Sequence, residues 1–565
     1  MDQSHSNEQP DARPLLPGED DEDEMPDTMR TDGNDDEAVS PGEPARGWRA
    51  ILHEHRRLQF ARAALVGLGA GILAVLFQYA LVMAEGARSA LLQRLHAFPW
   101  WGWLVVPLLG GISAGLAGWM TARFAPEAAG SGIPHIKGVL MHVRVLNWRR
   151  LLPVKFIGGV LAIGAGLSLG REGPTVQMGA AVGKAIGEWV HLPRRSRIQL
   201  IAAGAGAGLA AAFNAPLAGF IFVIEELQRE LSPLTYGTAL IAAVVADIVT
   251  RTFTGQLPSF HISGYAMPPL SALPLFAVVG VIAGLMGIAF NHSLLWTLRR
   301  FHAWKRMPRW ARPALVAALA GLLAWWLPQA VGGGHSFAEG LLRGQYAAAG
   351  FLGFLLLLFA AKFVLTVLSY GSGVPGGIFA PLLVLGALLG LMTGKVSELA
   401  FPIMAHTPAA FAVIGMAAAF AAIVRAPLTG IVLILEMTNN YQQLFPLLVA
   451  CMIAFLVAER LHNKPIYEAL LEYDLERTGF STHPQSAEPV TMELAVEPHS
   501  PMDGSRVRDL GLQEGCLMVM LNRGGREMVP SGGTRLLAGD HVTFFITGDA
   551  PQACAQVQTQ AKSVD

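Results

Sequence analysis

KFIGGVLAIGAGLSLGREGPTVQMGAAVG (155–183) and KFVLTVLSYGSGVPGGIFAPLLVLGALLG (362–390) align with each other without a gap. A second pair follows in register, AAAFNAPLAGFIFVIEE (210–226) and AAIVRAPLTGIVLILEM (421–437). Helices rich in Ala and Gly can resemble each other by composition alone. Here a lysine, two prolines, several glycines and a glutamate also match at nearly constant spacing, which indicates an internal repeat. The matched residues include Lys155 with Lys362, Pro174 with Pro381, Gly183 with Gly390, Pro216 with Pro427 and Glu225 with Glu436.

The repeat lies within a chain of membrane-protein composition. Of 565 residues, 52% are hydrophobic and only 15% are charged, whereas soluble domains average about 25% charged. Apolar runs of roughly 17–25 residues, the length that spans a bilayer, occur at 63–84, 103–120, 273–290 and 352–368. A large soluble helical domain is disfavoured because consecutive runs lack a polar face. The sequence therefore predicts an all-α polytopic membrane protein.

Three strings interrupt the apolar runs: GSGIP (130–134), GREGP (170–174) and GGIFAP (376–381). Internal repeats in transporters place the substrate at the repeat interface, between broken helices, and irregular backbone inside a membrane survives only where it lines protein or water. Each string has glycines just before a helix-forming run, so each predicts a helix N-terminus that exposes N–H groups to an anion. Three such ends would bind an anion through partial charges, without a fixed cation that holds it too tightly to release.

These strings, in this order and spacing, resemble the signatures of the CLC chloride channel and transporter family over residues 56–475. The resemblance implies an inverted-repeat fold with broken helices, with repeats at about 56–255 and 270–475 inside a transport domain of 49–477. It also implies secondary active exchange of chloride for protons, with a passive chloride channel of the same fold as the alternative. A homodimer with one pathway per subunit is expected on the same ground. A gradient sensor or membrane enzyme on this fold is a further reading, which only the C-terminal domain favours.

The resemblance assigns four chloride ligands. Ser131 in GSGIP would donate its hydroxyl, although a helix-capping role is open to it as well. Ile378 and Phe379 in GGIFAP would donate backbone N–H groups. Tyr467 in NKPIYEALL matches the inner tyrosine, whose hydroxyl coordinates the central anion. Serine at position 131 favours chloride, since nitrate-preferring relatives tend to carry proline there.

Glu172 in GREGP is the predicted external gate and proton carrier. A carboxylate at a helix N-terminus inside an anion path can occupy the anion site when ionised and leave it when protonated. That competition would couple the two fluxes. Simple helix capping is the alternative, and the neighbouring Arg171 is expected to be structural.

Glu226 decides between exchanger and channel. The repeat pairs Glu225 with Glu436, which predicts an architectural role for Glu225, and leaves Glu226 opposite Met437. The family's proton-coupled members have an internal proton acceptor at this point, and ionisable groups at membrane depth are functional by default. We expect Glu226 near the inner boundary, within reach of cytoplasmic protons; a solvated glutamate without function is the alternative. His135 and Lys137 stand where relatives often have acidic residues, so the inner proton route is expected to differ.

The two ends of the chain differ from its middle. Residues 1–48 are acidic, rich in Pro and Gly, and lack an apolar signal-peptide core, which predicts a disordered tail; a regulatory acidic tail is the alternative. Residues 478–565 alternate short β runs (516–522, 527–530, 541–547) with glycine turns, and LLAGDHVTFFI (536–546) resembles the TrkA-C module. The sequence therefore predicts a small cytoplasmic α/β domain. In other transporters, domains of this kind dimerise and can bind a small regulatory ligand. Basic clusters beside the spans favour cytoplasmic termini in a bacterial inner membrane.

Other classes of function find little support. A net charge of −1 suggests no nucleic-acid partner, and three scattered cysteines make neither a disulfide framework nor a zinc site. Phosphate-binding, zinc-protease and serine-hydrolase motifs are missing from the sequence. We therefore expect no enzyme, no metal and no cofactor, and transport driven by chloride and proton gradients across a lipid bilayer.

Overall fold

The computed structural model describes residues 43–228, 233–256, 260, 269–346, 352–401, 408–478, 487–513, 515–524, 526–548 and 550–561. Eight helices in this part are long and apolar enough to cross a membrane, which confirms the polytopic prediction. Most of the predicted tail, 1–42, lies outside the described residues. Residues 43–48 of that tail belong to the first helix, α1 (Glu43–Leu95), so the predicted boundary falls inside a continuous helix.

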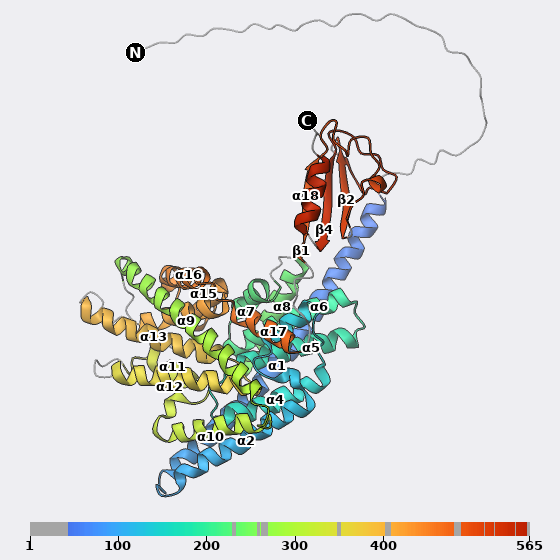
Figure 1. The fold of residues 1–565 in the computed structure, drawn as a ribbon. Helices are drawn as coiled ribbons and strands as arrows, with labels where there is room; N and C mark the ends of the chain where they lie inside the picture. Colours follow the sequence, from blue (N-terminus) through green and yellow to red (C-terminus); the bar gives the residue numbers. More distant parts are fainter. Residues whose placement is uncertain are drawn as a thin grey trace, which may run out of the picture. The chain divides into compact units, whose positions relative to one another are not determined.

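The membrane part is built from two series of helices (Figure 1). The first contains α1, α2 (Gly102–Phe124), η1 (Pro126–Ala128), α3 (Ile133–Leu140), α4 (Trp148–Gly164), α5 (Glu172–Trp189), α6 (Arg194–Phe213), α7 (Pro216–Phe222), η2 (Val223–Gln228) and α8 (Pro233–Thr254). The second contains η3 (Leu270–Ala272), α9 (Leu273–Ala303), α10 (Ala311–Trp326), η4 (Pro328–Ala330), α11 (His335–Leu342), α12 (Leu352–Gly371), α13 (Phe379–Ala400), α14 (Pro408–Val424), α15 (Pro427–Thr438), η7 (Tyr441–Gln443) and α16 (Leu444–Arg460). The last membrane-domain helix is α17 (Ile466–Arg477).

The structural repeat extends further than the sequence match. The short helices η1 and α3 correspond to η4 and α11, and each pair is joined through a left-handed glycine, Gly132 (φ 83°) and Gly334 (φ 82°). Lys155 Nζ donates to the carbonyls of Ala128 and Gly130, at 3.0 and 2.7 Å. Lys362 Nζ donates to the equivalent carbonyls, of Ala330 and Gly332, at 3.2 and 2.6 Å. The string GGGHS (332–336) is thus the structural partner of GSGIP.

Close packing explains several matched glycines. A side chain at Gly183 on α5 would collide with the carbonyl of Leu200 on α6, and one at Gly390 on α13 with the carbonyl of Phe411 on α14. Helices inside a membrane gain stability from such backbone contact through small residues, because lipid gives them no hydrophobic drive to associate. The pairs α5/α6 and α13/α14 are therefore the paired cores of the two repeats.

The two repeats also cap each other reciprocally. The carboxylate of Glu225 accepts hydrogen bonds from the backbone N–H groups of Leu428 and Thr429, at the start of α15. The carboxylate of Glu436 accepts from Leu217 and Ala218, at the start of α7. Exchange of equivalent contacts in both directions is the signature of two-fold related units. The predicted architectural role of Glu225 and the inverted repeat are both confirmed.

The C-terminal domain is a separate small α/β unit. Its antiparallel sheet has the order β1-β4-β2-β3, made of β1 (Ala487–Ala495), β2 (Cys516–Arg523), β3 (Arg526–Met528) and β4 (His541–Gly548). A 3-10 turn, η8 (Val507–Asp509), and the final helix, α18 (Ala550–Ala561), complete it. Buried Leu521, Val542, Phe544 and Val557 form its core. The sequence predicted β2, β3 and β4 and missed β1, although residues 490–494 alternate apolar and polar side chains.

Candidate anion and proton site

The three interrupting strings meet in space. Gly170 and Gly377 exchange backbone hydrogen bonds of 2.7 and 2.8 Å, which ties GREGP to GGIFAP. Gly130 donates to the carbonyl of Val374 and accepts from Gly376, both at 3.0 Å, which ties GSGIP to the same segment before α13. The N-termini of α3, α5 and α13 are therefore held together, as the sequence predicted. Their exposed N–H groups make the junction attractive to an anion.

Glu172 is the first residue of α5 and lies at this junction. Its side chain is buried, and its carboxylate lies beside the backbone N–H groups of Glu172 itself and of Ala380 in the first turn of α13. Among the described residues, Oε2 has no hydrogen-bond partner. A cavity of about 560 Å³ adjoins it, lined by Glu85, Arg88, Arg171 and Glu172 among others. The carboxylate thus takes the place that an anion would occupy between two helix N-termini.

Ser131 lies on the other side of the first turn of α5. A side chain at Gly173 would collide with Ser131, so the two helix starts touch. Ser131 is fully buried, and its Oγ lies 3.4 Å from the hydroxyl of Tyr370 and 3.4 Å from the N–H of Ile133. The distance to Ile133 is long for a cap, so the hydroxyl keeps capacity for another acceptor.

The remaining predicted ligands belong to the same neighbourhood. Ile378 precedes α13 and Phe379 begins it; both are fully buried, and the Phe379 ring packs on Phe213 and Phe420. Tyr467 is fully buried on α17, and its hydroxyl has no hydrogen-bond partner among the described residues. It lies within electrostatic range of Tyr370, Glu226 and Glu172. A buried hydroxyl without a partner is costly unless a ligand satisfies it.

Tyr370, near the end of α12, is a residue that the sequence interpretation missed. Its hydroxyl touches Ser131 and accepts weakly from the Ser131 N–H at 3.5 Å. The only signal was an aromatic residue with a hydroxyl in an apolar span, directly before the segment GSGVPGG (371–377). Tyr370 also lines a second cavity, of about 150 Å³, together with Gly130, Gly132 and His135. Two cavities therefore adjoin the junction, and they are lined by different residues.

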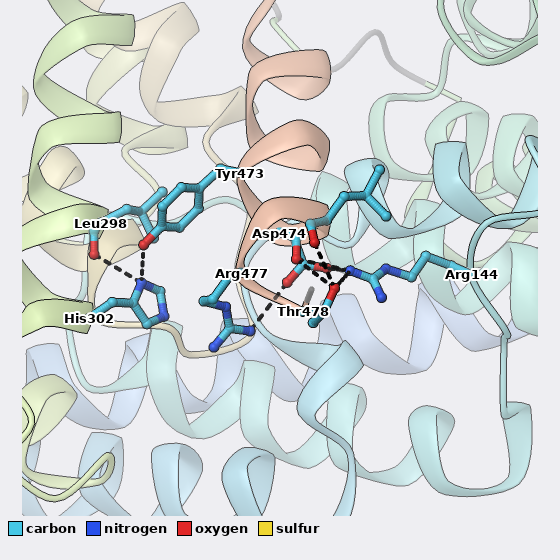
Figure 2. Close-up of polar contacts among 8 residues, drawn as sticks. Arg144, Leu298, His302, Tyr473, Asp474, Arg477 and Thr478 are labelled. Carbon is cyan, nitrogen blue, oxygen red and sulfur yellow. Dashed lines mark hydrogen bonds and ion pairs between the residues drawn. The ribbon is translucent and has the colours of Figure 1, made fainter. Parts of the chain in front are cut away.

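The second cavity ends in a polar cluster, shown in Figure 2. Arg144 donates to the backbone carbonyl and carboxylate of Asp474 at 3.0 and 2.6 Å, and to Thr478 at 2.8 Å. Arg477 reaches the other carboxylate oxygen of Asp474 at 3.2 Å. The Tyr473 hydroxyl lies 2.9 Å from Nδ1 of His302 on α9. Arg477, His302, Tyr473 and Asp474 line the cavity, so its wall is polar on this side.

Glu226 lies within η2, a π-helical turn that follows α7. It is 1% exposed, and its Oε1 accepts from Lys137 Nζ at 2.7 Å. The solvated alternative is therefore wrong, because the carboxylate is buried and paired with Lys137 on α3. The expected reach of cytoplasmic protons to Glu226 stays a prediction. Sequence periodicity could not predict this pair, since π turns leave no regular pattern.

Two neighbours of the site hold structural positions. Arg171 donates to the carbonyl of Ala212 at 3.0 Å, as expected for a structural residue. His135 contacts the carbonyl of Val145 at 3.2 Å and the side chain of Gln177 at 3.3 Å. His135 therefore braces the start of α3. Among the described residues, no group of three or more His, Cys, Asp and Glu side chains could hold a metal ion.

Paired broken helices around a buried anion junction define a membrane transport protein of the inverted-repeat class. The profile of the voltage gated chloride channel family matches residues 110–459, and that of the TrkA-C domain matches residues 491–555. The chain therefore belongs to the voltage gated chloride channel family and carries a C-terminal TrkA-C domain.

Relatives of known name cover most of the membrane part. The H(+)/Cl(-) exchange transporter ClcA of Vibrio cholerae serotype O1 (strain M66-2) is 42% identical over 420 residues, which is 73% of this chain and 88% of that protein. ClcA of Yersinia pestis bv. Antiqua (strain Angola) is 38% identical, over 82% of this chain and 96% of that protein. The crystal structure of a slow cyanobacterial Cl-/H+ antiporter matches with a TM-score of 0.70 at 38% identity, over 74% of this chain and 99% of that one.

Proposed function

We propose that this protein is a secondary active antiporter that exchanges chloride for protons across a bacterial inner membrane. One observation carries the proposal: a buried carboxylate, Glu172, stands where the N-termini of α5 and α13 meet. An ionised Glu172 competes with chloride for the same N–H groups. A protonated Glu172 is neutral, so it no longer competes as an anion. Each exchange of chloride at this point therefore involves a proton on Glu172.

The chloride ligands are neutral donors. The Ser131 and Tyr467 hydroxyls and the N–H groups of Ile378 and Phe379 offset the dehydration of chloride without a full positive charge. Partial charges of this kind bind an anion and still release it, which conduction and exchange both require. The Tyr467 hydroxyl, unpartnered among the described residues, supports this assignment.

Glu226 is the internal proton acceptor. It is the second buried carboxylate near Tyr467, and the repeat gives it no structural counterpart. A passive channel needs no such group, and buried charge without a role is costly. The exchange transporters among the relatives support the same choice over a channel.

Reconstitution into liposomes tests the proposal. An outward chloride gradient should drive protons into the liposomes against their gradient, with chloride and proton movement recorded in the same sample. Glu226→Gln should stop the proton movement and leave chloride flux running, because the amide cannot carry a proton. Chloride flux without proton movement in the native protein would instead establish a channel.

Assembly and orientation are further parts of the proposal. We expect a homodimer with one pathway per subunit and both termini in the cytoplasm. The half-exposed Leu217 and Leu428, each beside a capping glutamate, support an apolar contact face. The TrkA-C domain supports binding of a small regulatory ligand. Light scattering in detergent tests the dimer, and a fully active monomer would exclude it.

A further inference from the structure

One buried cation, the ammonium of Lys137, lies close to two carboxylates beside the proposed anion path. Lys137 Nζ lies 2.7 Å from Glu226 Oε1 and 3.6 Å from Glu468 Oε1. The side chains of Lys137 and Glu226 are 6% and 2% exposed, whereas that of Glu468 is 31% exposed. The three groups thus form a series from the interior toward solvent, with the ammonium in the middle.

Three separate elements bring these groups together. Lys137 belongs to the last turn of α3, where the helix dipole favours a cation. Glu468 belongs to the first turn of α17, where the dipole favours an anion. Glu226 belongs to the π turn η2, where its neighbour Glu225 caps α15.

With the ammonium held in its observed position, only one protonation state of Glu226 leaves the buried charges paired. With Glu226 ionised, the ammonium is paired and the group carries one net negative charge, on the partly exposed Glu468. If Glu226 takes a proton while the ammonium stays in place, a buried cation loses its closest partner, which is strongly unfavourable. If the ammonium moves toward Glu468 instead, both charges remain paired. A carboxylate at 3.6 Å makes that movement short.

We propose that Lys137 is a mobile counter-ion that lets Glu226 bind and release protons while buried. This inference rests on the proposed role of Glu226 as internal proton acceptor. When a cytoplasmic proton binds a carboxylate oxygen of Glu226, the ammonium breaks its hydrogen bond to Glu226 and pairs with Glu468. When the proton leaves toward Glu172, the ammonium returns. Lys137 keeps its three protons throughout, so it is a positioning residue and carries no proton itself.

Several other titratable groups on α3 and on the elements near it have partners outside this group. Each of the following has a contact described for it outside this group: His135 on α3, Arg144 after it, Glu225 on η2, Asp474 on α17, Lys184 and Glu188 on α5. Tyr467, also on α17, is within electrostatic range of Glu226 and is the proposed chloride ligand. Of the described ion pairs, those of Glu226 and Glu468 both use Lys137.

Two substitutions should shift the pH dependence of proton transport in opposite directions. In Lys137→Met, Glu226 loses its counter-ion and holds its proton more tightly. Chloride-driven proton flux should then reach half of its maximum at a cytoplasmic pH about one unit higher, since a nearby opposite charge shifts a carboxylate by about 1–3 units. In Glu468→Gln, the ammonium stays on Glu226, and the half-maximum should move to lower pH. Lys137→Arg should restore most of the native profile.

The double variant provides the sharpest test. In the Lys137→Met background, Glu468→Gln should cause at most half of the shift that it causes alone, because no ammonium remains to be redirected. Glu472→Gln is the matched control: it lies one turn further along α17 and removes an exposed ion pair with Lys464. Its profile should match that of the native protein. Chloride flux from the same liposomes verifies that each variant is folded.

The outcomes separate this inference from the proposed function. If Glu226→Gln stops proton movement but the Lys137 and Glu468 variants shift the profile in the same direction or leave it unchanged, the counter-ion role is wrong and the antiporter stands. An equal Glu468→Gln shift in both backgrounds also overturns it. If Glu226→Gln keeps full proton coupling, the acceptor assignment fails, and this inference fails with it. If Lys137→Met does not fold, the absence of a shift to lower pH in Glu468→Gln still overturns the counter-ion role.

Discussion

The first repeat of the membrane domain contains the proposed gate and proton acceptor, Glu172 and Glu226, and the second repeat has no carboxylate at the equivalent positions. Where the repeats match, the residues hold backbone: Lys155 and Lys362 each bind two carbonyls, and Glu225 and Glu436 each cap a helix. Where they differ, the first repeat has polar or charged groups. The mismatched positions are Ser131 against Gly333, Lys137 against Glu339, Glu172 against Phe379 and Glu226 against Met437. Symmetry therefore supplies the frame, and departures from symmetry supply the proposed site.

The largest effect should come from Glu172→Gln, at the mismatch with Phe379. An amide can neither carry a proton nor compete as an anion, so chloride-driven uphill proton movement should fall to background while chloride flux continues. Paired flux measurements in liposomes check this. Glu188→Gln, in the last turn of the same helix α5, is the control and should stay coupled. Uphill proton movement in Glu172→Gln would refute the gate assignment.

The matched glutamates should behave alike. Glu225→Gln and Glu436→Gln each weaken charge-assisted hydrogen bonds to a helix N-terminus, and we expect each to destabilise the protein by about 2 kcal/mol. Thermal unfolding in detergent should show similar losses for both variants, and surviving protein should keep its ratio of proton to chloride flux. Loss of coupling in Glu225→Gln alone would show that the wrong carboxylate of the pair had been named.

The matched lysines should separate stability from transport. Lys155→Met and Lys362→Met each leave two buried carbonyls without their donor, at a cost of about 1–3 kcal/mol per unsatisfied group. Both variants should unfold at similarly lowered temperatures. Only Lys155 supports the loop that carries Ser131, so chloride flux should fall several-fold further in Lys155→Met than in Lys362→Met. Equal flux losses would mean that both loops serve transport equally.

Much of the frame could be predicted because it leaves local signals. Apolar runs marked the spans, glycines marked the broken helices, and the pairing of Glu225 with Glu436 predicted an architectural role for Glu225. The equivalence of GSGIP and GGGHS could not be predicted from the sequence because the two strings share only glycines. The two strings share a left-handed backbone conformation at Gly132 and Gly334. Many different side chains are compatible with this conformation at the neighbouring positions.

The parts of the site that were missed depend on contacts between distant segments. Tyr370 reaches Ser131 across 239 positions of the chain, and Lys137 reaches Glu226 across 89. Hydrophobic periodicity does not predict contacts between residues so far apart in the sequence. A π turn also changes which face of the helix a residue occupies, relative to a regular α-helix. The sequence could therefore single out Glu226 as unpaired in the repeat, but it could not predict that Lys137 is the partner of the buried carboxylate.

The smallest effect should come from Ser131, where the two repeats differ by a single hydroxymethyl group. Ser131→Pro removes the hydroxyl and the N–H and reshapes the start of α3, so the nitrate-to-chloride flux ratio should rise a few-fold. Ser131→Ala removes only the hydroxyl and should give a smaller rise. The counterpart, Gly333→Ala, is the matched control, because its new methyl group meets the carbonyl of Leu169 at 3.3 Å and touches no proposed ligand. Its flux ratio should stay native. Because a hydroxyl donor favours the more strongly hydrated chloride, an unchanged ratio in both Ser131 variants would remove Ser131 from the ligands. The N–H groups of α13 and the Tyr467 hydroxyl would then have to account for selectivity alone.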